Sequence, residues 1–155
     1  MKPTLYILCG PSGCGKSTWA AEFMEHDDIH YVSRDNIRLE FLKEGEDYFS
    51  HEKAVFRRFS QTITQLLQKN CDVIADATHL NEFSRRKLTQ AIDMNFQDYN
   101  IVYVVFHVDA DTCVARNENR SGRRYVPENV IRNMCRDFRA PTKDEDERVR
   151  EIIEV

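Results

Sequence analysis

Residues 10–18 read Gly-Pro-Ser-Gly-Cys-Gly-Lys-Ser-Thr and satisfy the pattern Gly-x-x-x-x-Gly-Lys-Ser/Thr. Glycines in such a loop let the chain bend around a polyphosphate while successive backbone N–H groups point inward. We expect a helix to start near Lys16, whose ammonium would reach the β- and γ-phosphates, while the Ser17 hydroxyl would bind Mg²⁺. The segment therefore predicts a site for a nucleoside triphosphate. Its expected nucleotide-binding residues are Gly10, Ser12, Gly13, Cys14, Gly15, Lys16, Ser17 and Thr18.

Short apolar runs and helical patterns alternate along the rest of the chain. Strands are expected at 4–9, 29–33, 72–75, 100–108 and 150–155. Helices are expected at 16–25, 35–43, 52–69, 82–95, 110–119 and 127–138. Strands that are apolar almost throughout and separated by helices indicate a parallel sheet covered on both faces. We therefore expect one α/β domain over residues 1–155, with about five strands.

The composition excludes several classes of protein. A chain of 155 residues with 41% hydrophobic and 31% charged residues fits a soluble globular domain. Its longest apolar runs, 5–9 and 101–106, are too short to cross a bilayer, and its N-terminal residues lack a signal-peptide cleavage site. The five cysteines are scattered without a Cys-x-x-Cys pair, which argues against disulfides and structural zinc. We expect a cytoplasmic protein that makes no membrane contact. Because its net charge is −4, any nucleic-acid contact requires a local basic patch.

A second segment, Ser33-Arg-Asp-Asn-Ile-Arg38, follows the second expected strand. A phosphate-binding loop in a short domain, without the sensor motifs of motor ATPases, favours a kinase. A kinase needs a group that deprotonates the acceptor hydroxyl, and the Asp35 carboxylate stands where a strand ends over the ligand crevice. Arg38 lies one helical turn beyond and would share that face. The alternative is that Asp35 only caps the helix.

The third expected strand ends in Val73-Ile-Ala-Asp-Ala-Thr-His-Leu-Asn81. An Asp at the carboxyl end of a buried parallel strand resembles a Walker B residue, so Asp76 could hold Mg²⁺ through water or anchor the phosphate loop. The alternative is a turn residue that ends the strand. We interpret His79 as a turn residue, because no second His or carboxylate has metal-ligand spacing to it.

Arginine outnumbers acidic residues between positions 116 and 139, although the whole chain is acidic. Arg116 and Arg120 are four residues apart and would share a helix face, and Ser121-Gly122 would then break the helix. Guanidinium groups that close over a triphosphate offset charge in the transition state, so we expect a lid at about 116–127. The alternative is a solvated charged face.

Other reactive or basic groups have weaker interpretations. The clusters Arg57-Arg58 and Arg85-Arg86-Lys87 could guide a nucleic-acid backbone, but our default is that they are solvent-exposed. Cys14 lies in the phosphate loop beside a helix N-terminus, which would lower its pKa. We therefore expect alkylation of Cys14 to inactivate the protein and bound ATP to protect it.

Four segments together resemble the kinase domain of phage-type polynucleotide 5′-hydroxyl kinases. They are Gly-Pro-Ser-Gly-Cys-Gly-Lys-Ser-Thr-Trp (10–19), Ser-Arg-Asp-Asn-Ile-Arg (33–38), Ile-Ala-Asp-Ala-Thr-His-Leu-Asn (74–81) and the lid residues 116–127. The resemblance covers nearly the whole chain, although the third segment and the lid are each one residue longer than the family pattern. It implies a P-loop kinase fold: a five-stranded parallel sheet, helices on both faces and a short Arg-rich lid.

The resemblance also implies roles for individual residues. Asp35 would be the general base, Arg38 would contact the 3′-phosphate of the terminal nucleotide, and the Arg116–Arg120 pair would hold the ATP phosphates. The catalytic residues would be Lys16, Asp35 and Arg120. The acceptor would be bound by Asp35, Arg38 and Thr78, and the metal by Ser17 and Asp76.

The sequence thus predicts ATP-dependent phosphoryl transfer, with Mg²⁺, to the 5′-hydroxyl end of RNA or DNA. A separate phosphatase or ligase could cooperate with such an enzyme, and the oligomeric state stays open. Two alternatives stand beside this prediction. One is a kinase acting on a nucleoside, sugar, antibiotic or nucleotide-sugar. The other is a nucleotide-gated binding module with weak ATPase activity.

Overall fold

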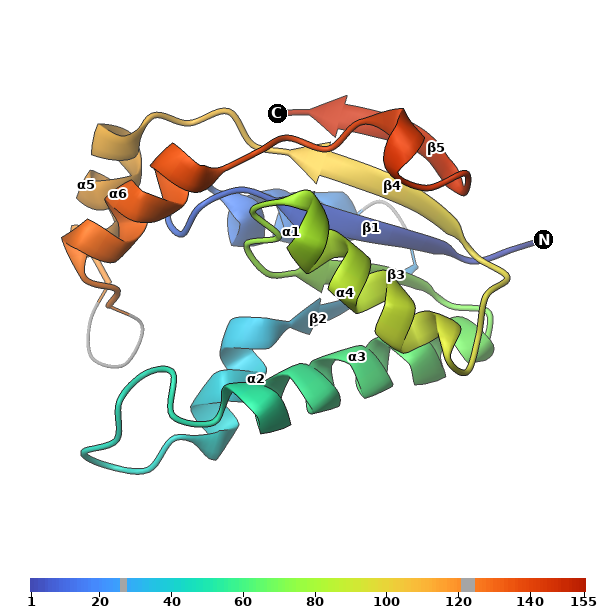
Figure 1. The fold of residues 1–155 in the computed structure, drawn as a ribbon, viewed down its shortest axis with the longest axis horizontal. Coiled ribbons are helices and arrows are strands. Elements are labelled where there is room, and N and C mark those ends of the chain that lie inside the picture. The colour runs from blue at the N-terminus through green and yellow to red at the C-terminus, as the bar shows by residue number, and fades with distance from the viewer. Residues whose placement is uncertain (26–27, 121–124) are drawn as a thin grey trace.

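Residues 1–25, 28–120 and 125–155, which the computed structural model describes, contain a five-stranded sheet (Figure 1). Its strands are β1 (Thr4–Cys9), β2 (Ile29–Ser33), β3 (Asp72–Asp76), β4 (Asn100–Val105) and β5 (Val149–Glu154). Every neighbouring pair is parallel, in the order β2-β3-β1-β4-β5. The predicted parallel α/β sheet is confirmed. The strand expected at 100–108 stops at Val105, because its partner β1 ends opposite it at Cys9.

The helices lie where the sequence patterns place them, and no end differs from the expected one by more than two residues. They are α1 (Lys16–Met24), α2 (Arg34–Phe41), α3 (Glu52–Gln68), α4 (Glu82–Asp93), α5 (Ala110–Glu118) and α6 (Glu128–Asp137). A short 3₁₀ turn, η2 (Lys143–Glu145), precedes β5. None of the helices in the described ranges is long and apolar enough to span a membrane.

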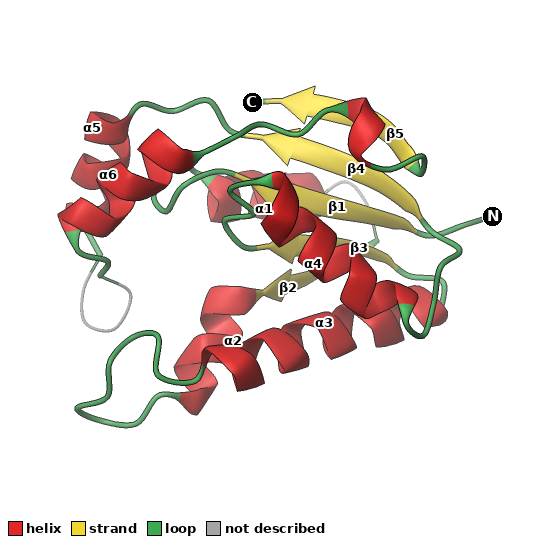
Figure 2. Ribbon diagram, in the orientation of Figure 1, coloured by secondary structure: helices red, strands yellow, loops and turns green. Residues whose placement is uncertain are grey.

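Helices cover both faces of the sheet because the strand side chains alternate between two apolar clusters. On one face, Leu5 and Ile7 of β1 pack with residues of α3 and α4, including Phe59 and Leu88. On the other face, Leu8 of β1 packs with residues of α1, α5 and α6. Figure 2 shows these two helical layers with the sheet between them.

The carboxyl ends of the strands all open on the same edge of the sheet, because every strand runs in the same direction. In Figure 1, the loop after α2 and the helices α5 and α6 lie on this side of the molecule. The connections that leave β1, β2 and β3 there contain most of the predicted site residues, and the predicted lid arginines follow β4. The topology therefore places the predicted site at the edge where open α/β sheets bind ligands.

Arg85 of the basic cluster 85–87 is a structural residue. Its side chain is 1% exposed and forms a bidentate ion pair with Glu145 of η2, at 3.0 Å and 2.7 Å. It also donates a hydrogen bond to the carbonyl oxygen of His79. The buried Arg85 guanidinium thus joins α4 to the segment before β5. Our default interpretation, that the cluster 85–87 is solvent-exposed, is therefore wrong for Arg85.

Candidate active site

The phosphate loop connects β1 to α1, and its backbone carbonyl groups accept hydrogen bonds from Lys16. Gly13 and Gly15 have φ angles of +84° and +100°, which side chains other than glycine rarely adopt. A Cβ atom at Gly13 would also lie 2.5 Å from the carbonyl oxygen of Cys113 on α5. The Lys16 Nζ atom donates to the carbonyl oxygens of Gly10 and Pro11, at 2.9 Å and 2.8 Å. The loop is therefore already curved around the ammonium group that a triphosphate would meet.

Cys14 is buried beneath this loop, with 3% of its surface exposed. Burial raises the pKa of its thiol, although Lys16, whose Nζ lies 3.7 Å from the Sγ atom, acts in the opposite direction. The expectation that the helix N-terminus lowers this pKa is wrong, because desolvation of the thiolate outweighs the nearby positive charge. Cys14 and Gly10 are not among the residues that line the cavity, whereas Ser12, Gly13 and residues 15–18 are.

Ser17 and Asp76 are brought together at the ends of α1 and β3. The Ser17 hydroxyl donates to Asp76 Oδ2 at 3.3 Å, and the Tyr31 hydroxyl donates to the same carboxylate oxygen. Burial and then the Asp76 charge raise the pKa of Tyr31 to about 12, so its phenol stays a hydrogen-bond donor. Asp76 is thus more than a turn residue, because its carboxylate links β3 to α1 and β2.

A hydroxyl and a carboxylate fit Mg²⁺, which uses few protein ligands and takes the others from phosphates and water. The described residues contain no cluster of three or more His, Cys, Asp or Glu side chains that could hold a metal alone. Ser17 and Asp76 are therefore suited to a metal that arrives with the nucleotide.

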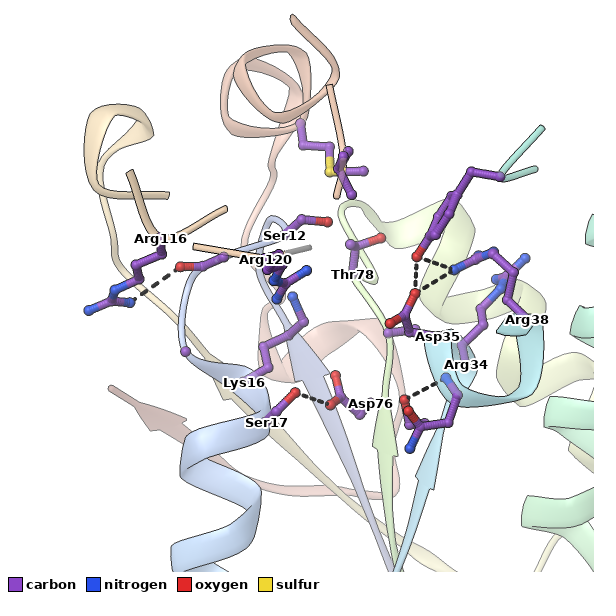
Figure 3. Close-up of a pocket in the computed structure, with 18 of the residues that line it drawn as sticks. Ser12, Lys16, Ser17, Arg34, Asp35, Arg38, Asp76, Thr78, Arg116 and Arg120 are labelled. Carbon is purple, nitrogen blue, oxygen red and sulfur yellow. Dashed lines mark hydrogen bonds and ion pairs between the residues drawn. The ribbon is translucent and has the colours of Figure 1, made fainter. Parts of the chain in front are cut away.

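Asp35 stands in the first turn of α2, but it is not the cap of that helix. The Ser33 side chain caps α2 by accepting a hydrogen bond from the Asn36 backbone N–H at 3.1 Å. The Asp35 carboxylate instead accepts a hydrogen bond from the Tyr48 hydroxyl, and its Oδ1 lies 3.5 Å from Arg38 Nη1. The Asp35 carboxylate therefore faces the Arg38 guanidinium and the Tyr48 hydroxyl, and all three residues line the cavity (Figure 3).

Arg38 is held between α2 and α3. Its Nε and Nη2 atoms donate to the two carboxylate oxygens of Glu52, at 2.8 Å and 2.7 Å, and Nη1 donates to the Tyr48 hydroxyl at 3.1 Å. Arg34 also donates to Glu52, at 3.2 Å. Burial raises the pKa of Glu52, but the hydrogen bonds and charges of Arg38 and Arg34 outweigh it and hold that pKa below its usual value. The ionised Glu52 thus orients both arginines at the cavity.

Of the two lid arginines, only Arg116 lies on α5, because the helix ends at Glu118 and Arg120 follows it. The expectation that the two share a helix face is therefore wrong. Arg116 donates from Nη1 to the carbonyl oxygen of Gly13 at 3.3 Å, and Arg120 also lines the cavity. Asn117 joins the two ends of the lid, because its amide donates to the Val126 carbonyl oxygen at 2.6 Å and accepts from the Val126 N–H at 3.0 Å. Residues 121–124 of the predicted lid lie outside the described residues.

His79 follows β3 and has a φ angle of +43°. Its ring is buried, and Nδ1 lies 2.7 Å from the carbonyl oxygen of Leu8. Burial lowers the pKa of His79 to about 4, so the ring is neutral at neutral pH. The interpretation of His79 as a turn residue holds for its backbone, while its side chain joins the turn to β1.

One cavity of about 530 Å³ is lined by Lys16, Ser17, Asp35, Arg38, Asp76, Arg116 and Arg120. Figure 3 shows Lys16 from the start of α1, Asp76 from the end of β3 and Asp35 from the start of α2, with Thr78 between the two sides. The cavity lining also includes residues that the sequence analysis did not single out: Tyr31, Arg34, Tyr48, Phe49, Glu52, Asn119 and Met134. Arg34 and Asn119 lie within quoted segments, and the others carry no spacing signal that marks them.

The fold and this cavity define a P-loop kinase domain. The model of the AAA domain family matches residues 5–141, and the chain belongs to that family. A curated adenylate kinase from Encephalitozoon cuniculi (strain GB-M1) is 28% identical over an alignment of 144 residues, and the match covers 87% of this chain and 77% of the relative.

Two solved structures have the same fold. A chain in the structure of the Pnkp1/Rnl/Hen1 RNA repair complex is 25% identical, with a TM-score of 0.75 over 88% of this chain. The crystal structure of a fungal RNA kinase is 13% identical, with a TM-score of 0.71 over 99% of this chain, which is evidence of the fold alone. The present chain spans 44% and 38% of the lengths of these two proteins.

Proposed function

We propose that this domain transfers the γ-phosphoryl group of ATP to the 5′-hydroxyl end of RNA or DNA. The observation that carries the proposal is that one cavity contains both the Lys16–Ser17 phosphate loop and the Asp35–Arg38 pair. A phosphate donor site beside a carboxylate and a guanidinium is the arrangement that phosphoryl transfer to a hydroxyl requires.

The reaction assigns each group a task. The Asp35 carboxylate takes the proton of the acceptor hydroxyl while that oxygen forms a bond to the γ-phosphorus. The bond from the γ-phosphorus to the β,γ-bridging oxygen breaks, and ADP leaves with the electron pair. Lys16 and Arg120 offset the charge on the transferring group, and Arg116 and the backbone of the phosphate loop hold the donor phosphates. Mg²⁺, bound by Ser17 and Asp76, would neutralise charge on the β- and γ-phosphates.

Acceptor binding would occur on the other side of the cavity. Arg38 would contact a phosphate of the acceptor strand, with its guanidinium oriented by Glu52, and Thr78 would line the path between donor and acceptor. The Tyr48 hydroxyl, which now donates to Asp35, occupies a place where the acceptor hydroxyl would donate its proton. Acceptor binding is therefore expected to displace the Tyr48 hydroxyl from Asp35.

The preference for a polynucleotide over a small acceptor is supported by a comparison and by the resemblance described above. The chain is 25% identical, over most of its length, to part of a protein in an RNA repair complex. The present chain spans less than half of that protein. We therefore also propose that a separate phosphatase or ligase cooperates with this domain. We place the RNA or DNA end first among the acceptors on this ground.

A panel of acceptors tests the proposal. Labelled ATP is offered with 5′-hydroxyl RNA and DNA oligonucleotides, with nucleosides and with sugars, and the labelled products are separated. We expect label at the 5′ end of oligonucleotides, and a fall of about 10²-fold or more in this transfer in Asp35→Asn, with ATP affinity retained. Near-wild-type transfer by Asp35→Asn would contradict the assigned base.

A kinase for a small acceptor is the second candidate, favoured by the 28% identity to an adenylate kinase over 87% of this chain. The same panel separates the two: label on a nucleotide, nucleoside or sugar, with none on any oligonucleotide, would favour the second candidate. ATP hydrolysis that no acceptor and no change at Asp35 affects would instead indicate a nucleotide-gated binding module.

A further inference from the structure

The loop between α2 and α3 brings two adjacent aromatic residues, Tyr48 and Phe49, to the cavity. Phe49 is 47% exposed and belongs to neither apolar cluster of the core. The rings of Tyr48 and Phe49 meet edge to face, with their centroids 4.8 Å apart at an angle of 88°. Phe49 is thus a half-exposed apolar ring that lines a polar cavity, where it can contact an apolar part of a ligand.

Arg38 holds both rings in place. Its Cζ atom lies 4.6 Å from the centroid of the Tyr48 ring and 5.3 Å from that of the Phe49 ring. The guanidinium itself is anchored by Glu52, so the aromatic pair rests on a fixed group. The loop adds its own hydrogen bonds, among them the Glu46–His51 contact at 2.9 Å. The exposed face of Phe49 is therefore preorganised before any acceptor binds.

The same guanidinium lies next to the candidate base. Arg38 Nη1 is 3.5 Å from Asp35 Oδ1, and Arg38 Cζ is 5.3 Å from the Phe49 ring. If the acceptor hydroxyl binds at Asp35, the group attached to the same sugar can therefore reach the Phe49 ring. A planar base attached to that sugar can stack on such a ring, with a gain that depends little on the identity of the base.

We propose that Phe49, supported by Tyr48 and Arg38, is a stacking platform for the base of the acceptor's terminal nucleotide. This inference rests on the proposed function and narrows the acceptor to a molecule that has a nucleobase next to the phosphorylated hydroxyl. Because every base has a π face, the platform selects for the presence of a base and discriminates little among the four bases.

Two acceptors that differ only at the terminal base test the platform. Both are 5′-hydroxyl oligonucleotides, and one has an abasic sugar at its 5′ end. We expect wild type to show a KM about tenfold higher for the abasic acceptor, with similar kcat. Phe49→Ala is expected to raise KM for the base-bearing acceptor about tenfold and to leave KM for the abasic acceptor unchanged. Phe49→Trp keeps a ring and is expected to behave like wild type.

Phe83→Ala is the matched control, because Phe83 is 77% exposed on α4 and is not among the residues that line the cavity. It is expected to leave both KM values unchanged. If Phe49→Ala changes KM for the two acceptors by the same factor, or changes neither KM, the platform is disproved while the proposed function stands.

The failure of the proposed function has a different signature: wild type labels neither oligonucleotide. Fluorescence anisotropy of the same two oligonucleotides then tests the platform directly. A selective loss of affinity for the base-bearing strand in Phe49→Ala supports it, and equal affinities in wild type and variant overturn it.

Discussion

Glu52, the first residue of α3, accepts hydrogen bonds from Nε and Nη2 of Arg38 on α2, at 2.8 Å and 2.7 Å. The pair joins the helix that contains the candidate base to the longest helix of the domain. Because the Arg38 side chain is 9% exposed, its charge needs compensation, which Glu52 at 2.7 Å supplies together with Asp35 at 3.5 Å. The acceptor side of the cavity is thus built around an ion pair whose partners are 14 residues apart in the chain.

Glu52→Ala is expected to destabilise the domain by about 1.5–3 kcal/mol, because it removes hydrogen bonds to a largely buried charged group. It is also expected to raise KM for the acceptor more than KM for ATP. Thermal unfolding and steady-state kinetics check the two effects. Glu40→Ala is the control, since Glu40 pairs with Arg58 between the same two helices but at exposed positions. Equal effects of the two substitutions would contradict the role of Glu52.

Asp76→Asn is expected to increase the Mg²⁺ concentration for half-maximal transfer by about tenfold, because it removes the charge of one of the two proposed metal ligands. An Mg²⁺ titration of the transfer rate measures this. Asp72→Asn on the same strand is the control, because Asp72 accepts a hydrogen bond from the Thr4 N–H at the opposite end of β3. An unchanged Mg²⁺ requirement in Asp76→Asn would remove Asp76 from the metal site.

Cys14 is expected to react with iodoacetamide at least about tenfold more slowly than Cys71, because burial raises the pKa of the Cys14 thiol and limits access to it. Peptide mapping by mass spectrometry during the reaction gives both rates. Activity should persist while Cys71 is modified and fall only as Cys14 reacts. If Cys14 is alkylated as fast as Cys71, burial does not protect the Cys14 thiol and the prediction is wrong.

His79 is expected to make stability depend on pH between about 6.5 and 4. Burial, and then the positive charges of Arg34, Lys16 and Arg85, lower its pKa to about 4 in the folded state, while the Leu8 carbonyl acts in the opposite direction. In this window the unfolded chain binds a proton and the folded chain does not, so stability falls as pH falls, by about 1.4 kcal/mol per pH unit.

Urea unfolding at a series of pH values in wild type and His79→Asn measures this dependence. Asn tolerates the positive φ angle of position 79 and does not titrate. The slope that wild type shows in this window should be smaller in the variant. Parallel curves for the two proteins would show that His79 does not cause the dependence.

Much of the fold could be predicted because its signals are local. The apolar run at 4–9 and the shorter mixed stretch at 29–33 both form strands with the predicted ends. Asp109 caps α5 by accepting a hydrogen bond from the Thr112 N–H at 2.8 Å, and such a cap depends only on residues in the first turn of the helix. Strand ends were less predictable where they depend on a partner, as Val105 depends on Cys9.

The candidate site divides in the same way. The sequence alone determined the phosphate loop, the Ser33–Arg38 turn and the Asp76 position, since each combines residue types and spacing within one short segment. Only the tertiary structure decided that Arg38 pairs with Glu52, that Arg85 is buried against Glu145, and that Phe49 lines the cavity. Burial and ion pairing depend on what packs against a residue in three dimensions, and residues brought together across loops and helices leave no periodic pattern in the chain.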